Sequence, residues 1–303
     1  MKAPISKPTE AFGLAVAKIY GDMPARPVHL SYKTEFSDPG FAVGKATLKK
    51  QNLILDLGES EITFPLFSVI PNDRDDCPAI VNLGFESCVP NKYLPAEEII
   101  DRGYAIFHIS IGDISDNSGN FKSGISSVIA RSRRKKSSPG KAAVWAWAAA
   151  RVVEHILGLN TVDNKNILLS GHGITAISAL ILAGCDENVG FVIANDPFAP
   201  FGGLSASAIA TQMPHLFCPA YSDEPTDNFI KPLLLNCVDK KIMIRSAADK
   251  PFFNAGAERD IIADAGRYGC EIYYQLRGGG EYFSREDWNN YLDYIDEKIS
   301  TKP

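Results

Sequence analysis

The stretch NILLSGHGITAISALILAG, residues 166–184, decides the fold of this chain. Its opening residues, NILLS (166–170), are apolar enough for a buried strand, and the apolar run from Ile174 is long enough for a helix. The glycines on either side of His172 supply a tight turn between the two. A buried strand that turns abruptly into a helix predicts a mostly parallel sheet covered by helices.

Strand-like and helix-like segments alternate on both sides of this unit. An early antiparallel strand is indicated at 61–71, where apolar side chains alternate toward one face. Ser284 can cap the last helix, with Asp287 at its third position. Further buried strands are predicted at 78–85, 104–113, 190–196, 240–249 and 270–279, and helices at 95–103, 140–159 and 284–299.

The length of 303 residues suits one large domain, and we expect a single domain over 1–303. The segment 201–229 is the longest without a clear period, so we expect an irregular lid or insertion there. The basic run at 131–136 is expected to be a solvated loop before a helix, with an anion or partner contact as the alternative.

The composition limits the classes of function. A hydrophobic share of 45% with 22% charged residues is typical of a globular protein. The 31 basic and 36 acidic residues give a net charge of −5, which argues against nucleic-acid and anionic-membrane binding. The sequence shows neither a signal-like apolar segment nor a membrane-length apolar run, so a cytoplasmic location is expected. The six scattered cysteines predict free, mostly buried thiols, and we expect no cofactor and no metal.

The turn in the opening stretch has the layout of a nucleophile elbow, G-x-S-x-G, at a strand-to-helix junction. Gly171 and His172 fit this layout, but Gly173 stands where the serine belongs. Over nearly its whole length the chain resembles bacterial α/β-hydrolases of the acetylxylan-esterase and glucuronoyl-esterase type. The segments that carry the resemblance are PAEEIIDRGYAIF, GKAAVWAWAAARV, SGHGITAISALILAG, FVIANDP, PHLFCPAY and GGGEYFSREDW. The resemblance implies an α/β-hydrolase fold.

The resemblance also implies roles for the elbow positions. The family elbow is similar to G-H-S-R-x-G-K, in which the serine attacks the ester, the arginine stabilises the oxyanion and the lysine contacts the sugar. Position by position, the serine becomes Gly173, the arginine Ile174, the second glycine Ala176 and the lysine Ile177. The family histidine lies in a G-x-H segment shortly before an x-E-D-W helix, and Glu281 occupies its position here.

The histidine positions give an independent check. In this fold the catalytic histidine follows the last strand, after the nucleophile and the acid. The five histidines are His29, His108, His155, His172 and His215, so none lies in that part of the sequence. A standard Ser-His-acid triad therefore cannot be assembled. The resemblance leaves the acid position open among Asp196, Asp249 and Lys250.

Other residues near the elbow are weak substitutes. Ser170 is expected to point into packing, His172 to support the turn, and Cys185 to lie in the core. A metal site made of His172, Asp196 and Glu281 is not predicted, because the spacing has no metal-ligand signature. The residues expected to line a remaining pocket are His172, Ile174, Thr175 and Ile177.

Loss of a triad serine or histidine costs about a million-fold in turnover, roughly 8 kcal/mol of barrier. We therefore expect a non-catalytic binding or scaffold protein, with a carbohydrate or a protein as its partner. A small carboxylate or sugar acid is a further candidate ligand, because amides at a helix N-terminus still attract anions. The alternative is hydrolysis of carbohydrate esters in which Glu281 and Asp196 act as acid and base on a water molecule.

Overall fold

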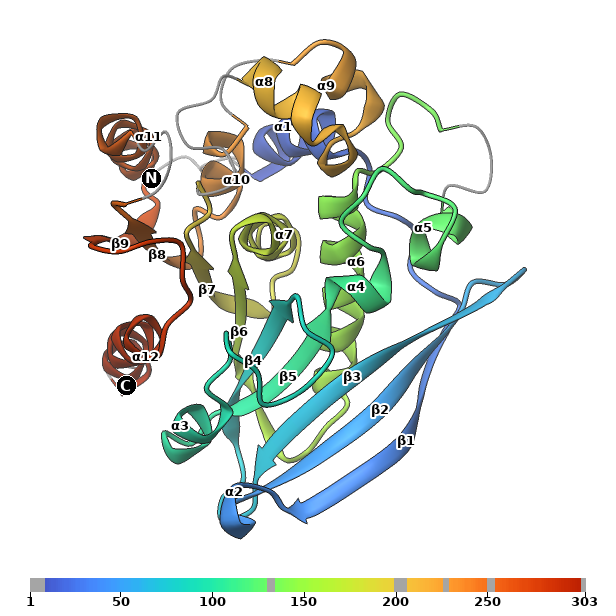
Figure 1. The fold of residues 1–303 in the computed structure, drawn as a ribbon, viewed down its shortest axis with the longest axis vertical. Helices are drawn as coiled ribbons and strands as arrows, with labels where there is room; N and C mark the ends of the chain where they lie inside the picture. The colour runs from blue at the N-terminus through green and yellow to red at the C-terminus, as the bar shows by residue number, and fades with distance from the viewer. Residues whose placement is uncertain (1–8, 130–133, 199–205, 226–228, 250–253, 301–303) are drawn as a thin grey trace, which may run out of the picture.

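The fold is built on one mixed sheet, and the computed structural model describes residues 9–129, 134–198, 206–225, 229–249 and 254–300. Within these residues the sheet has nine strands in the order β1-β2-β3-β5-β4-β6-β7-β8-β9 (Figure 1). The strands are β1 (His29–Gly40), β2 (Ala46–Asp56), β3 (Glu61–Pro71), β4 (Cys77–Gly84), β5 (Ala105–Ser110), β6 (Val162–His172), β7 (Val189–Asn195), β8 (Lys241–Ala247) and β9 (Glu271–Arg277).

The strand directions divide the sheet into two parts. The pairs β1–β2, β2–β3 and β3–β5 are antiparallel. The pairs β5–β4, β4–β6, β6–β7, β7–β8 and β8–β9 are parallel. The mostly parallel sheet and the early antiparallel strand at 61–71 are thus confirmed. Because β6 lies inside the parallel part, its carboxyl end meets those of β4 and β7 at one edge of the sheet.

Helices cover both faces of the sheet, as Figure 1 shows for α6 and α7 on one side and α3 and α12 on the other. Apolar side chains of α1, α6, α7 and α10 share one buried cluster, and those of α3 and α12 share a second. The helices are α1 (Thr9–Tyr20), α2 (Phe41–Gly44), α3 (Ala96–Asp101), α4 (Ile111–Ile114), α5 (Gly124–Ile129), α6 (Lys141–Leu157), α7 (Ile174–Ala183), α8 (Ala206–Gln212), the 3₁₀ helix η1 (Pro214–Leu216), α9 (Pro219–Asp223), α10 (Lys231–Asn236), α11 (Ala255–Arg267) and α12 (Arg285–Ser300).

Two predicted boundaries differ from the structure for local reasons. The strand predicted at 104–113 ends at Ser110, whose hydroxyl accepts a hydrogen bond of 3.2 Å from Gly112 N and caps α4. The segment predicted as irregular, 201–229, contains α8, η1 and α9 in its described part. Helix α9 lies beside α1, and α8 packs beside α9 (Figure 1). A role of this segment as a lid stays a prediction.

The last helix begins as its sequence predicts. The Ser284 hydroxyl accepts from Asp287 N at 3.2 Å, and an Asp287 carboxylate oxygen accepts from Ser284 N at 2.8 Å. This reciprocal pair is the predicted capping box, and it stabilises the helix by about 1 kcal/mol. It also fixes the position of the buried Asp287 carboxylate, which pairs with Arg245 of β8 and Arg277 of β9.

Candidate functional site

The turn between β6 and α7 keeps the strained backbone of a nucleophile elbow. Gly173 has φ 58° and ψ −120°, a conformation that glycine adopts without a Cβ penalty. A Cβ on Gly171 would lie 2.5 Å from the carbonyl carbon and oxygen of Thr175, so the close approach of α7 to β6 requires glycine there. Thr175 Oγ1 accepts from His172 N at 2.8 Å and donates to His172 O at 3.0 Å, which closes the turn.

The residues predicted to line a pocket at the elbow do not all do so. Ile177 and Thr175 are completely buried, and Ile174 is 6% exposed. Ile174 and Ile177 belong to the buried cluster beneath α6 and α7, so their side chains contribute to packing. Of the four residues, His172 is the one whose side chain is only half-buried. Cys185 was predicted to be core, but α7 ends at Ala183 and the cysteine is exposed.

Ser170 lies in a buried polar chain beneath the elbow. Its hydroxyl donates to Asn82 Oδ1 at 2.7 Å, and Asn82 Nδ2 lies 2.8 Å from His108 Nδ1. His108 Nε2 in turn lies 2.7 Å from the Glu86 carbonyl oxygen and donates to it. Burial lowers the pKa of His108, so the imidazole is neutral and its two nitrogens have one acceptor and one donor role. This chain satisfies buried groups and leaves Ser170 with a structural role, as predicted.

His172 lies in an aromatic cluster beside the elbow. Its ring stacks on Tyr93 at 5.8 Å, and it also contacts Phe85 at 6.4 Å and Phe283 at 6.1 Å between ring centroids. Asn195 Nδ2 lies 3.0 Å from His172 Nδ1, so this nitrogen accepts and the proton resides on Nε2. Burial, followed by the charge of Arg277, lowers the pKa of His172 to about 4. The imidazole is therefore neutral near pH 7.

Asp196, one of the three candidates for the acid position, lies directly after β7. Its backbone has a φ of 49°, and its side chain is completely buried. Oδ1 accepts from Ala247 N at 2.7 Å, and Oδ2 accepts from Arg277 Nη2 at 3.0 Å. The carboxylate is thus bound to a guanidinium, whereas the triad of an active hydrolase binds its acid to a histidine.

Arg277 is the centre of the site's electrostatics. Its Nε lies 2.9 Å from the buried Asp287 Oδ1, in an ion pair that lacks hydrogen-bond alignment. Its two Nη atoms donate to the carbonyl oxygens of Gly280, at 2.8 Å, and Tyr282, at 2.6 Å. Asp287 also accepts from Arg245 Nη1 at 2.8 Å. One guanidinium therefore connects the acid after β7, the start of α12 and the loop after β9 that carries Glu281.

The other carboxylates do not converge on the elbow. Glu281 is exposed. Asp249 is also exposed, and its Oδ2 accepts from Gly279 N at 2.8 Å, which ties the end of β8 to the loop after β9. Lys250 lies outside the described residues. Among the residues that the structure describes, no group of three His, Cys, Asp or Glu could hold a metal ion.

The sequence interpretation missed two features of this site. Arg277 ends a strand immediately before three glycines, and a cation at that place was the available signal. The aromatic cluster combines His172, the last residue of β6, with residues that follow β4 and β9. No local spacing in the sequence could reveal it. Both features depend on contacts between segments that are far apart in the sequence.

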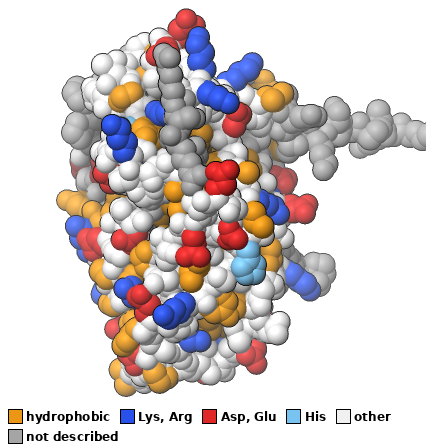
Figure 2. Space-filling view, turned by 90° about the vertical axis from the view of Figure 1, so that its right-hand side faces the viewer, with side chains coloured by type: hydrophobic (Ala, Val, Ile, Leu, Met, Phe, Trp, Pro, Cys, Tyr) orange, Lys and Arg blue, Asp and Glu red, His pale blue; other side chains and the backbone are white. Residues whose placement is uncertain are grey.

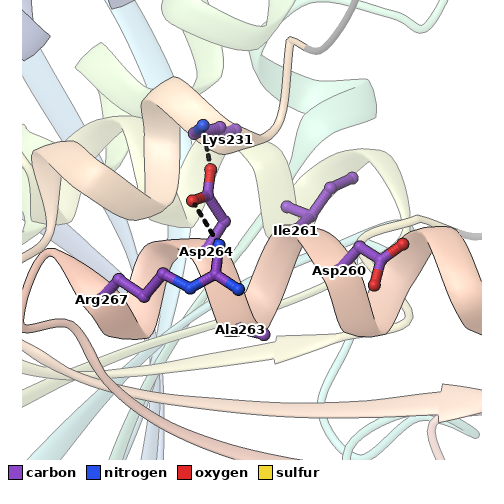
Figure 3. A pocket seen from close by; sticks show the side chains of 6 residues that line it. All are labelled: Lys231, Asp260, Ile261, Ala263, Asp264 and Arg267. Carbon is purple, nitrogen blue, oxygen red and sulfur yellow. Dashed lines mark ion pairs between the residues drawn. The ribbon is translucent and has the colours of Figure 1, made fainter.

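The surface and one of the pockets away from the elbow have mixed charge. Figure 2 shows acidic and basic side chains interspersed on one face, with neither sign dominating. A pocket of about 410 Å³ lies between α10 and α11. There Asp264 pairs with both Lys231 and Arg267 (Figure 3), so the charges largely compensate one another. In the part of the chain that the structure describes, no helix is long and apolar enough to span a membrane.

The sheet order, the elbow and the position of Asp196 define the α/β-hydrolase fold. Comparison with solved structures agrees: a glucuronoyl esterase from Solibacter usitatus has a TM-score of 0.83 and 20% identity, over 96% of this chain and 92% of that chain. A promiscuous esterase of carbohydrate esterase family 15 (CE15) from a marine bacterial metagenome has a TM-score of 0.80 and 19% identity, over 96% and 91%.

A CE15 glucuronoyl esterase from Teredinibacter turnerae has a TM-score of 0.78 and 15% identity, over 94% of this chain and 83% of that chain. No family model matches the sequence, and no curated protein matches it either. At these identities the similarity establishes the fold, and the predicted likeness to glucuronoyl esterases is confirmed at that level.

Proposed function

We propose that this protein is a catalytically degenerate member of the carbohydrate-esterase type that binds a carbohydrate ligand beside the elbow without hydrolysing it. The observation that carries the proposal is the pairing of Asp196 with Arg277 at 3.0 Å, next to an elbow whose central residue is Gly173. A hydrolase of this fold needs a nucleophile and a base that its acid orients. Here the acid position is engaged by a guanidinium that can neither take nor give a proton.

The aromatic cluster supports a carbohydrate as the ligand. In this cluster Phe85 is 37% exposed, and Tyr93 and His172 are half-buried. Rings with one free face bind the apolar faces of sugars, and the neutral His172 Nε2–H can donate to a sugar oxygen. The solved structures with this fold are named glucuronoyl esterases, which favours a uronic acid or its ester. Six free cysteines support the cytoplasmic location expected from the sequence.

Hydrolysis by Glu281 and Asp196 is less well supported. Such a mechanism needs two carboxylates at one accessible place, with environments that separate their pKa values. Asp196 is completely buried and paired with Arg277, and Glu281 is exposed. The proposal therefore assigns neither residue a catalytic role.

A binding experiment tests the proposed ligand. Titration of the wild type with glucuronate, methyl glucuronate and glucose in a calorimeter should give saturable binding for at least one of the uronic compounds. Tyr93→Ala should weaken that binding about tenfold, because it removes the ring that stacks on His172. Tyr268→Ala is the matched control, since Tyr268 is 57% exposed and follows α11, away from the elbow. Absence of saturable binding, or equal effects of both variants, would contradict the proposed ligand site.

Reconstruction of the triad tests the proposed loss of catalysis. Gly173→Ser/Glu281→His restores a nucleophile and a histidine by sequence position. This double variant should not hydrolyse methyl glucuronate, because Arg277 still binds Asp196. Adding Arg277→Gln frees the carboxylate and should yield the first measurable turnover. Gly190→Ser/Glu281→His serves as the control for substitutions away from the elbow.

A further inference from the structure

A second pocket, separate from the elbow, lies between the loop after α4 and the segment that contains η1 and α9. Its volume is about 520 Å³. The lining residues that matter are Phe121, Lys122, Arg134, His215, Ser222 and Asp223. None of them belongs to the elbow, the aromatic cluster or the Arg277 network.

Arg134 is a half-buried cation in the lining of this pocket. Its Cζ lies 3.7 Å from the ring centroid of Phe121, and its Nη2 donates to the Pro139 carbonyl oxygen at 3.0 Å. Within the described part of the chain it forms no ion pair with a carboxylate. Burial lowers the pKa of Arg134, yet a guanidinium remains charged near pH 7. A cation held over a ring in a pocket is ready to bind an anion.

Lys141 binds the loop that contributes Asn120 and Phe121 to the pocket lining. It is completely buried at the start of α6, and its Nζ donates to Ser115 Oγ at 2.6 Å and to Asn120 O at 2.7 Å. It also pairs with Asp116 Oδ1 at 3.1 Å and lies 5.0 Å from the Phe121 ring centroid. These bonds fix the loop that presents Phe121, so Arg134 keeps its orientation without a ligand.

The remaining lining residues define what kind of anion would fit. Lys122 is an exposed second cation, and among the described residues it too lacks a carboxylate partner. His215 Nε2 lies 2.8 Å from Asn117 Oδ1, and burial with the nearby Lys141 charge lowers its pKa, so it is neutral near pH 7. Asp223 adds one exposed negative charge, which repels a simple anion but accepts well from a hydroxyl group.

We propose that this pocket binds a small hydroxylated anion, with the oxyanion on Arg134 and Lys122 and a hydroxyl group on Asp223. A phosphate or a carboxylate group could supply the oxyanion, and a sugar skeleton could supply the hydroxyl. Of the described part of the basic run, Arg134 lines the pocket, while its neighbour Lys135 is exposed and does not line it.

Calorimetric titration of the full chain with glucose 6-phosphate, glucuronate and glucose tests the proposal. We expect saturable binding of at least one of the two anions and none of glucose. The Arg134→Met variant should weaken binding about tenfold or more, since a charged hydrogen bond is lost. Lys135→Met removes the same charge one residue away and should leave the affinity unchanged within about twofold, the scale of a screened surface charge.

The outcomes distinguish binding in this pocket from binding at the elbow and from non-specific attraction of anions to surface cations. Failure of both anions to bind saturably would overturn the proposal, as would equal effects of Arg134→Met and Lys135→Met. If Arg134→Met proves unfolded by circular dichroism, Lys122→Met changes an exposed side chain and must still weaken binding. Tyr93→Ala should leave the binding of glucose 6-phosphate unchanged; loss of that binding in the variant would contradict the proposal and assign the phosphate to the aromatic cluster.

Discussion

The elbow and the loop after β9 differ in what they keep of an ester hydrolase. The elbow keeps the backbone: Gly173 has the strained φ and ψ, and Gly171 still allows α7 to approach β6. The loop after β9 lies beside Asp196, and its Arg277 connects Asp196 to Asp287. Packing fixes the backbone at the elbow, whereas ion pairs fix the side chains at the loop after β9. Under the proposed function, this ion-pair network stands where a hydrolase of this fold has its catalytic side chains.

The largest expected effect comes from breaking that network at its centre. Arg277→Met leaves the completely buried carboxylates of Asp196 and Asp287 short of a cation. We predict a decrease of about 3–5 kcal/mol in the free energy of unfolding, measured by urea denaturation. Arg267→Met, at an exposed ion pair, should cost less than about 1 kcal/mol. Asp196→Asn should restore part of the loss in the Arg277→Met background; without such rescue, the pair would not be the source of the stability.

The next effect tests the packing of the elbow. Gly171→Ala places a Cβ 2.5 Å from backbone atoms of Thr175, so β6 and α7 must separate. We predict a loss of about 2–3 kcal/mol in the same urea experiment. Gly190→Ala in β7 is the matched control, because a Cβ there has no neighbour within 4 Å. Equal stabilities of the two variants would show that β6 and α7 can separate at the elbow at no cost in stability.

The sequence predicts the elbow better than it predicts the contacts of the loop after β9. The elbow, the parallel strands around it and the capping box of α12 arise from residues that are close in sequence, and all were predicted. The surroundings of the elbow were predicted less well: Asp196 was a candidate for the acid position, but its pairing with Arg277 was not predicted, and Glu281 is exposed. That pair joins residues 81 positions apart, and it forms only when β7 and β9 lie on either side of β8. Ile177 was expected at a pocket, yet α7 buries it completely.

The pH dependence of stability probes His172, which lies between the two regions. Its folded pKa of about 4 is below the ordinary value of 6.5, mainly because of burial. The unfolded chain therefore binds more protons in this range, and the stabilising contribution is complete above about pH 6.5 and is lost as the pH falls toward 4. We predict that His172→Gln flattens the decline in unfolding free energy between pH 7 and pH 4 by about 2 kcal/mol. An unchanged decline would place the titrating group elsewhere.

The smallest effect concerns Gly173, the central residue of the elbow. Gly173→Ala introduces a Cβ at a φ of 58°, which should cost about 1–2 kcal/mol of stability. Thermal unfolding would measure this as a lower midpoint temperature, with Gly190→Ala again as the control. A stabilising result would mean that the strained backbone relaxes in solution, and the elbow would then not be a preserved feature.

We propose that the protein does not hydrolyse esters, because Arg277 binds Asp196 and the elbow carries Gly173 at its centre. The most direct test of this proposal is the hydrolysis of methyl glucuronate and simple acetyl esters by the purified wild type, beside a heat-denatured sample and the Asp196→Asn variant. The account predicts that all three give the same background rate. Turnover by the wild type that disappears in Asp196→Asn would contradict it, because Asp196 would then act in catalysis despite its bond to Arg277.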